Sequence, residues 1–269
     1  MVEIVEKVDC PNCGAPLKIK AGEIVVTCEY CGTAVNLKAD KPFVLSHSII
    51  PNKYSQEEAV AAVKSWMRSG YAMPSDLAGR TQVTKADLVF LPFYVVTARA
   101  STTFRGVLTR TGGTKPVAET LTGEYEWTVL GRRSAAFPER EYKIPLSGKS
   151  SFDLSLVQGE FLNAELDENE ARTLAEKGIE ANQMYRIREK VDTVEESQTD
   201  IEIKDSEFLH APIWFIEYQY QGSTYRVLLD GCTGQIITGD IPFGESTFPW
   251  VWLAAGAAIV IGILLILLL

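Results

Sequence analysis

The spacing of hydrophobic residues predicts a helix near the start of the middle part of this 269-residue chain. Residues 55–70, SQEEAVAAVKSWMRSG, repeat apolar side chains at the interval that forms one helix face. Ser55 and Glu58 have the spacing of a capping box, and Gly70 suits the end of the helix.

A second helix is predicted to begin at Asp167, because Glu170 completes the same capping pattern three residues later. Gly178 is a candidate end, since glycine is common at helix C-termini, and the alternative is that helix resumes through EANQMYRIREKV at 180–191. The acidic run DTVEESQTD at 192–200 shows no hydrophobic period, and we expect it to form a solvated connection.

Most of the remaining middle part predicts β-strands. The segments 88–103, 127–130 and 208–220 are apolar and rich in aromatic or β-branched residues. Residues 213–238 contain two turn signals between such segments, which predicts a three-stranded meander. The glycine-rich TGGTKP at 111–116 is the expected tip of another hairpin.

A faint repeat links two of the strand segments. LPFY, which begins at Leu91, is echoed by APIW, which begins at Ala211. We expect each proline to occupy the first position of a strand, where no ladder donor is lost. We expect the two copies to pair in one antiparallel sheet with the helices against one face. The predicted class is therefore α+β, with a cytosolic domain at 41–247 for which the repeat suggests an internal duplication.

The last apolar segment predicts a membrane anchor. Residues 250–269 carry no charge, and as a helix they span about 30 Å, the thickness of a bilayer core. Phe248, Trp250 and Trp252 precede or begin it, where aromatic rings favour the headgroup boundary. The alternative is a buried core helix, but such helices usually keep a polar side. We therefore expect a C-terminal transmembrane anchor at 248–269. The start, MVEIVEKVDC, has no signal-peptide pattern, so we expect a single-pass protein with its N-terminal bulk in the cytosol.

Four of the five cysteines form two pairs near the N-terminus, within CPNCGAPLKIKAGEIVVTCEYCG. Cys10 and Cys13 are separated by two residues, as are Cys28 and Cys31, with 14 residues between the pairs. This spacing is typical of a four-thiolate zinc site, and the alternatives are a pair of disulfides or a redox site. We expect one structural Zn²⁺ in a ribbon at 1–40, with a hairpin between the knuckles that turns at residues 21–22. So small a ribbon would need the metal to fold.

The charge and the remaining motifs exclude several functions. A net charge of −9 argues against nucleic acid as a partner, and the lysines and glutamates between Cys10 and Cys31 cancel. The two histidines, His47 and His210, are expected to be structural or solvated. The GKS at 148–150 lacks the earlier glycine of a phosphate loop. Cys232 could be a reactive thiol, but we expect it to be an ordinary turn residue. We find no catalytic motif and expect a non-enzymatic protein.

Several segments resemble a known family. YSQEEAVAAVKSWM, AMPSDL, FLPFYVVTARASTTFRG and the closing APIWFIEYQYQGSTYRVLLDGCTGQIITGDIP resemble bacterial and archaeal membrane proteins that begin with a transcription-factor-type, four-cysteine zinc ribbon. The Asp-Gly-x-Thr-Gly turn also resembles the β-rich domain called PepSY. The resemblance covers most of residues 10–247. It implies an adaptor or scaffold beside flotillin-like or phage-shock-type membrane proteins, and it implies no catalytic residues.

These observations favour one function over another. The first is a tail-anchored, non-enzymatic adaptor that binds the bilayer through 248–269 and protein partners through its zinc ribbon. The alternative is a membrane-tethered regulator that binds nucleic acid through the ribbon, which the acidic composition disfavours.

Overall fold

The computed structural model describes residues 8–38, 42–70, 73–110, 113–133, 137 and 142–242. The predicted anchor at 248–269 lies outside these residues. Within the described part, no helix is long and apolar enough to cross a membrane. The helices are α1 (Gln56–Ser69), α2 (Leu77–Arg80) and α3 (Glu168–Arg188), with the 3₁₀ turns η1 (Leu146–Gly148) and η2 (Leu154–Leu156). The strands are β1 (Val25–Thr27), β2 (Ala34–Asn36), β3 (Phe43–Leu45), β4 (His47–Ile49), β5 (Gln82–Arg110), β6 (Gly113–Leu130), β7 (Ser150–Ser151), β8 (Glu160–Phe161), β9 (Thr193–Tyr220), β10 (Ser223–Asp230) and β11 (Ile236–Gly239).

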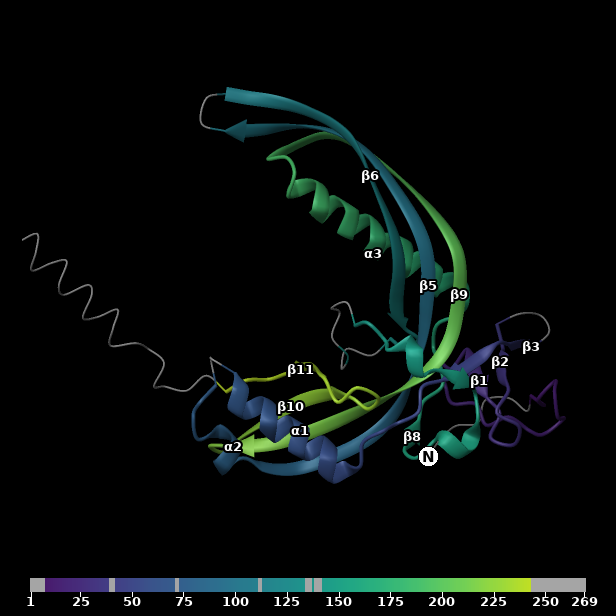
Figure 1. Ribbon diagram of the computed structural model, residues 1–269. Coiled ribbons are helices and arrows are strands. Elements are labelled where there is room, and N and C mark those ends of the chain that lie inside the picture. Colours follow the sequence, from purple (N-terminus) through teal and green to yellow (C-terminus); the bar gives the residue numbers. More distant parts are fainter. Residues whose placement is uncertain are drawn as a thin grey trace, which may run out of the picture.

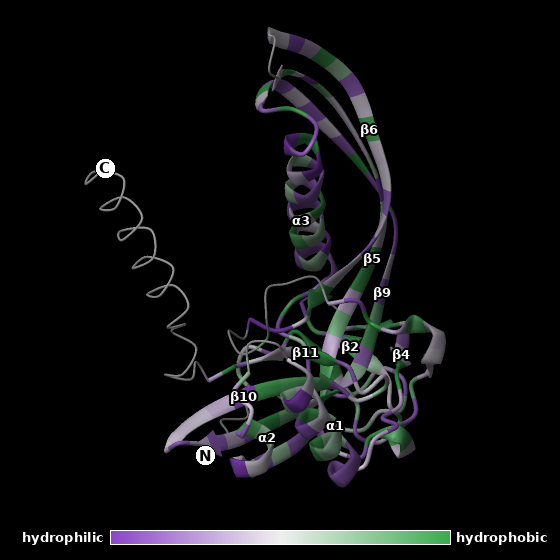
Figure 2. Cartoon of the chain, turned by 60° about the vertical axis from the view of Figure 1, so that its left-hand side comes forward, coloured by the Kyte–Doolittle hydropathy of each residue, from purple (hydrophilic) through white to green (hydrophobic). Residues whose placement is uncertain are grey.

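Three very long strands form the body of the molecule. β5 lies between β9 and β6 and is antiparallel to both. The strands curve, and α3 lies along their concave side in the upper arm of the crescent (Figure 1). In the lower arm β10 and β11 extend the sheet beside β9, and α1 packs against it. Hydrophobic residues gather in the lower arm, while the far end of the β5–β6 hairpin is mixed (Figure 2). The α+β class with a β-rich body and three helices is confirmed.

The two repeated segments pair with each other, as predicted. Leu91 on β5 lies opposite Ala211 on β9 in the antiparallel register. The predicted meander is also present, because β9, β10 and β11 are successive antiparallel neighbours. Gln221 and Gly222 connect β9 to β10 with positive φ angles of 50° and 81°, as in the two-residue hairpin turns that match strand twist. The β5–β6 hairpin closes at the predicted tip, where Arg110 pairs with Gly113.

The two prolines lie inside β5 and β9, so the prediction that they begin strands is wrong. The carbonyl of Pro92 accepts a hydrogen bond from the Gly131 N–H, and that of Pro212 accepts one from the Gly231 N–H, both at 2.8 Å. Because the nitrogen and carbonyl of a strand residue face the same side, each proline nitrogen faces away from the β5–β9 ladder. On that side β5 changes partner from β8 to β6, and β9 changes partner from β4 to β10. Each proline therefore lies where no ladder donor is needed.

The helix α1 begins as predicted. The Glu58 N–H donates to the Ser55 hydroxyl at 3.2 Å, and the Ser55 N–H donates to the Glu58 carboxylate at 2.8 Å. Gly70 is the C-cap. The buried face of α1 joins the hydrophobic core of the lower arm through Ala59, Val63 and Met67.

The helix α3 also begins at its predicted capping box, but it does not end at Gly178. The reciprocal bonds of Asp167 and Glu170 measure 2.8 and 3.2 Å, and the helix continues to Arg188. A Cβ at Gly178 would lie 2.3 Å from a ring carbon of Trp127 on β6. The glycine thus allows α3 to approach the sheet closely.

The prediction that the acidic run at 192–200 is a connection is also wrong, because β9 begins at Thr193. Within the described residues, this first part of β9 pairs only with β5. Its acidic side chains therefore lie on an edge strand, where like charges disfavour pairing with another copy.

Candidate metal centre

The four cysteines lie on two turns of nearly identical geometry. In the first turn the Gly14 N–H donates to the Cys10 carbonyl at 2.8 Å, and in the second the Gly32 N–H donates to the Cys28 carbonyl at 2.9 Å. Gly14 and Gly32 both have φ of 73°, a left-handed conformation that a side chain would strain. Each turn therefore directs its two sulfur atoms to one point.

The strand pairing in the ribbon differs from the prediction. The turn at residues 21–22 is present, but β1 pairs with β2, on the far side of the second knuckle. The first knuckle is closed by a separate bridge between Asp9 and Pro16. The prediction of a hairpin running between the two knuckles is therefore wrong: the first knuckle is closed by a single bridge and the second by the β1–β2 pair.

The sulfur positions fit one tetrahedral metal ion. The Sγ atoms of Cys10 and Cys31 are 3.7 Å apart, as are those of Cys13 and Cys28. All four lie within 4.8 Å of one another. Zn–S bonds of about 2.3 Å give a regular tetrahedron with edges of about 3.8 Å. The separations exceed a disulfide bond of about 2.05 Å, and all four cysteines are free. The predicted residues therefore form a cluster that can bind one metal ion.

The surroundings of the four thiols differ. Cys10 and Cys28 are buried with Leu17 and Val35, whereas Cys13 and Cys31 are exposed. A side-chain hydrogen bond with Thr33, helped by its N–H, lowers the pKa of Cys31 to about 6.

The pKa of Cys13 shifts in the opposite direction. An N–H bond from Ala15 favours its thiolate, but hydrogen bonds with the other cysteines, that with Cys31 first, and partial desolvation of the exposed sulfur outweigh it and raise the pKa to about 12. Burial also raises the pKa of Cys28. A divalent cation is what would make all four groups thiolates together.

The ribbon packs directly on the body. The Ile24 N–H donates to the Ala164 carbonyl at 2.8 Å, and Val25 forms a β-bridge with the same residue. Val25 belongs to a hydrophobic core that includes Tyr94 of β5. A Cβ at Gly32 would lie 2.9 Å from the Phe152 ring, so the second knuckle also rests on the body.

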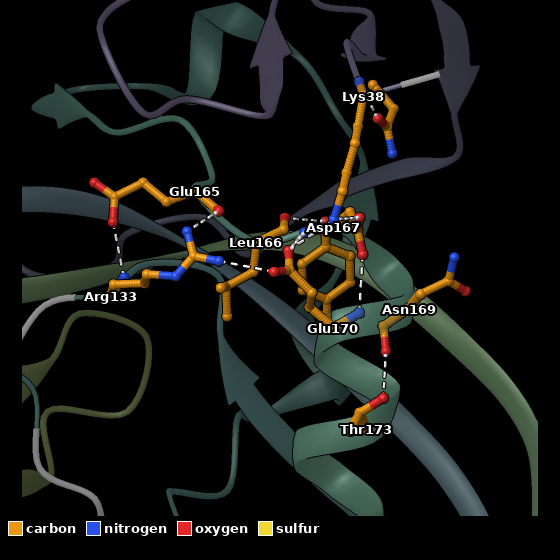
Figure 3. A network of polar contacts seen from close by, with 10 residues as sticks. Lys38, Arg133, Glu165, Leu166, Asp167, Asn169, Glu170 and Thr173 are labelled. Carbon is orange, nitrogen blue, oxygen red and sulfur yellow. Dashed lines mark hydrogen bonds and ion pairs between the residues drawn. The ribbon is translucent and has the colours of Figure 1, made fainter. Parts of the chain in front are cut away.

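A polar network joins the end of β2 to the start of α3 (Figure 3). The Lys38 ammonium lies 2.6 Å from the Asp167 carboxylate, which also caps α3. Burial opposes the charge of Asp167, but its bonds with Lys38 and the helix N–H groups outweigh burial and lower its pKa. Arg133 binds Glu170 at 2.8 Å on the other side of the cap. The ribbon and the first turn of α3 are therefore held together.

The structure brings together two histidines that the sequence analysis treated separately. Nε2 of His47 lies 2.7 Å from Nδ1 of His210, whose Nε2 donates to the Leu162 carbonyl at 2.9 Å. His47 stacks on Phe152 and His210 on Phe161, each with ring centroids 4.0 Å apart. No local signal reveals this pair, because only the parallel pairing of β4 with β9 brings the two rings together.

Cys232 lies outside the cluster, in the turn after β10. It is buried, and its N–H donates to the Asp230 carboxylate at 2.7 Å. The Thr233 N–H donates to the same oxygen at 2.9 Å. Asp230 thus fixes this turn, in agreement with a turn role for Cys232.

Comparison with protein families, curated proteins and solved structures finds no match. The resemblance to membrane proteins with an N-terminal zinc ribbon is therefore supported at one point, the four-cysteine cluster.

Proposed function

We propose that this chain is a tail-anchored membrane protein that acts as a non-enzymatic adaptor, with the ribbon as its docking module. The observation that carries the proposal is the four-cysteine cluster, in which one Zn²⁺ would have all four tetrahedral positions filled by sulfur. A zinc ion with no open position stabilises structure and does not bind substrate. The expected partners are flotillin-like or phage-shock-type membrane proteins.

The distribution of exposed apolar side chains supports docking at the ribbon. Among the described residues, six large hydrophobic side chains are exposed. Three of them lie on the ribbon or on β3, which pairs with it: Tyr30, Phe43 and Val44, at 66%, 46% and 52% exposure. Exposed aromatic groups of this kind are enriched in protein interfaces.

Crosslinking in the native membrane tests the docking role. We compare the wild-type chain with two variants: Cys10→Ser with Cys13→Ser, which removes metal ligands, and Tyr30→Ala with Val44→Asp, which keeps all four cysteines. The adaptor proposal predicts that both variants lose the same protein partner. The matched controls are Cys232→Ser, outside the cluster, and Tyr185→Ala, an exposed aromatic on α3. Unchanged recovery in both test variants contradicts the proposal, and ribbon-dependent recovery of nucleic acid supports the regulator instead.

Removal of residues 248–269 tests the anchor. The uncharged segment is expected to bind the bilayer, so the shortened chain should leave the membrane fraction after cell lysis. Retention of the shortened chain in washed membranes at high salt would show that another part of the molecule holds it there.

A further inference from the structure

A cavity of about 480 Å³ lies on the face of the lower-arm sheet that α1 does not cover. The helix shares its hydrophobic core with Leu88 and Phe90 of β5 and Trp214 of β9. Side chains alternate between the two faces of a sheet, so Val89 and Phe215, the next residues along these strands, face the cavity. Its volume falls in the range of about 300–1,000 Å³ that is typical of small-molecule sites.

The floor of the cavity is apolar and open to a ligand. Leu130, Leu162 and Phe215 line it and are all partly exposed. Leu228 of β10 lies directly opposite Phe215 in the antiparallel ladder, so these two side chains form one continuous surface. A ring or short alkyl chain placed on this floor would remove apolar area from water, which favours binding.

Carboxylates are in excess around this floor. The seven charged residues that line the cavity are Lys85, Asp87, Arg132, Glu160, Glu217, Arg226 and Asp240. The Arg132 guanidinium is already paired at 2.6 Å with Glu165, which does not line the cavity. With Glu165 included, three cations face five carboxylates, which leaves a charge of −2.

The ion pairs within the cavity leave two carboxylates unmatched. Lys85 lies 2.7 Å from Asp87, and Arg226 lies 3.3 Å from Glu217. Glu160 and Asp240 have no ion-pair partner among the described residues.

The negative field acts on a cation that is already present. The bond with Asp87 first, and then the charges of Glu217 and Glu160, outweigh partial desolvation and raise the pKa of Lys85. The same carboxylates would favour the charged form of a ligand amine in the cavity.

We propose that this cavity binds a small amphipathic ammonium ion, a primary amine that carries an aromatic ring or a short alkyl chain. The apolar group packs on Phe215 and Leu228. The ammonium lies at the edge of the floor near Glu160, which is the neighbour of Val89 in the ladder between β5 and β8. The site uses no residue of the ribbon or of 248–269, so it goes beyond the adaptor function and does not depend on it.

The probe is 2-(4-fluorophenyl)ethylamine, followed by fluorine NMR with the full-length chain in phosphatidylcholine nanodiscs. Empty nanodiscs measure the binding of the probe to lipid. Saturable binding beyond that of the empty nanodiscs is expected, with weaker binding of the neutral 2-(4-fluorophenyl)ethanol. Absence of saturable binding at millimolar probe, or equal binding of the alcohol, overturns the proposal.

A pair of matched variants tests the choice of a cation. Glu160→Gln keeps the size of the side chain and removes its charge, so it should weaken binding of the amine about two- to fivefold and leave binding of the alcohol unchanged. Glu195→Gln is the control, because Glu195 is an exposed glutamate on β9 that does not line the cavity. It should change neither affinity. Unchanged affinity for the amine in Glu160→Gln overturns the assigned position of the ammonium.

A covered floor tests the location. Thr238 on β11 lines the cavity, is exposed and lies opposite Leu228 in the ladder, so Thr238→Trp would place an indole ring over the floor. It should abolish binding, whereas Thr114→Trp, at an exposed position on β6, should not. Both positions are exposed, so neither change disturbs the core. Persistent binding in Thr238→Trp would place the probe elsewhere and overturn the site.

Discussion

Two histidines that are buried together should make this chain sensitive to mild acid. Burial lowers the pKa of His47 to about 4, and burial together with the charge of His47 lowers that of His210 well below its usual value. In the unfolded chain both titrate near 6.5. Between pH 6.5 and 4 the unfolded state therefore binds more protons, and folding stability falls as the pH falls, by up to about 1.4 kcal/mol per pH unit for each histidine.

Urea unfolding between pH 7.5 and 4.5 measures this loss. His47→Gln keeps an amide donor for Nδ1 of His210 but cannot titrate, so the slope of stability against pH should fall by about half. Most carboxylates titrate below this pH range, so the effect of the histidines on stability can be separated from that of the carboxylates. A wild-type stability that stays constant from pH 7.5 to 4.5 would show that the rings remain neutral in both states.

Gln183 on α3 is a second buried polar group, and its burial is expected to lower the free energy of unfolding. Its side chain is 0% exposed, and neither amide atom has a partner within the described chain. Gln183→Met keeps the length of the side chain and removes both polar atoms. We expect a gain of about 1–3 kcal/mol, with a rise in melting temperature of about 2–4 °C per kcal/mol. Gln198→Met, at an exposed position on β9, should change little. A loss of stability in Gln183→Met would mean that a bound water satisfies the amide.

These residues show which parts of the site the sequence reveals. The cysteines are predictable because metal geometry restricts the spacing within each knuckle, a local constraint. The His47–His210 contact joins residues 163 positions apart, and the strand pairing that creates it leaves no local pattern. Gln183 lies in the same four-residue row of α3 as the buried Ile179 and Ile187, so the helical period places it on the buried face although its side chain is polar.

At the level of elements, the close packing of α3 on the sheet depends on Gly178, although alanine has the higher helix propensity. Gly178→Ala should strengthen the isolated helix by about 1 kcal/mol but force its Cβ into Trp127. Overpacking typically costs about 1–3 kcal/mol or more, so we expect net destabilisation in thermal unfolding. Gly79→Ala in α2 is the matched control, since no atom lies within 4 Å of its Cβ position and the substitution should stabilise. A more stable Gly178→Ala variant would show that α3 can shift away from the sheet at little cost.

The contrast between local sequence signals and tertiary packing explains which element boundaries are predictable. The capping boxes at Ser55 and Asp167 are local, and both helices begin there. Gly178 is not a helix end and the two prolines are not strand starts, because packing and strand pairing decide those positions. A proline inside a strand is tolerated where its nitrogen faces no ladder partner, and in β5 and β9 that place is set by the distant segments at which the neighbouring strand changes.

For the whole molecule, the contacts of the ribbon make metal binding and body structure interdependent. The backbone bridge from Val25 to Ala164 joins the ribbon to the segment that precedes α3. Lys38 then extends the same connection to Asp167, whose side chain is only 8% exposed. A ribbon that lost its metal would lose the strand geometry that positions both contacts, because a four-thiolate module of this size depends on its metal to fold.

Removal of the metal should therefore loosen a region of the body that contains no metal ligand. After treatment with a chelator, hydrogen exchange should accelerate in residues 24–38 and also in 164–171, while β9 and β10 stay protected. Lys38→Met with the metal bound isolates one link, since it removes the ion pair to Asp167 but keeps the bridge at Ala164. It should accelerate exchange only in the first turn of α3. If residues 164–171 stay protected after chelation, the body holds that segment without the ribbon, and loss of the metal affects the ribbon alone.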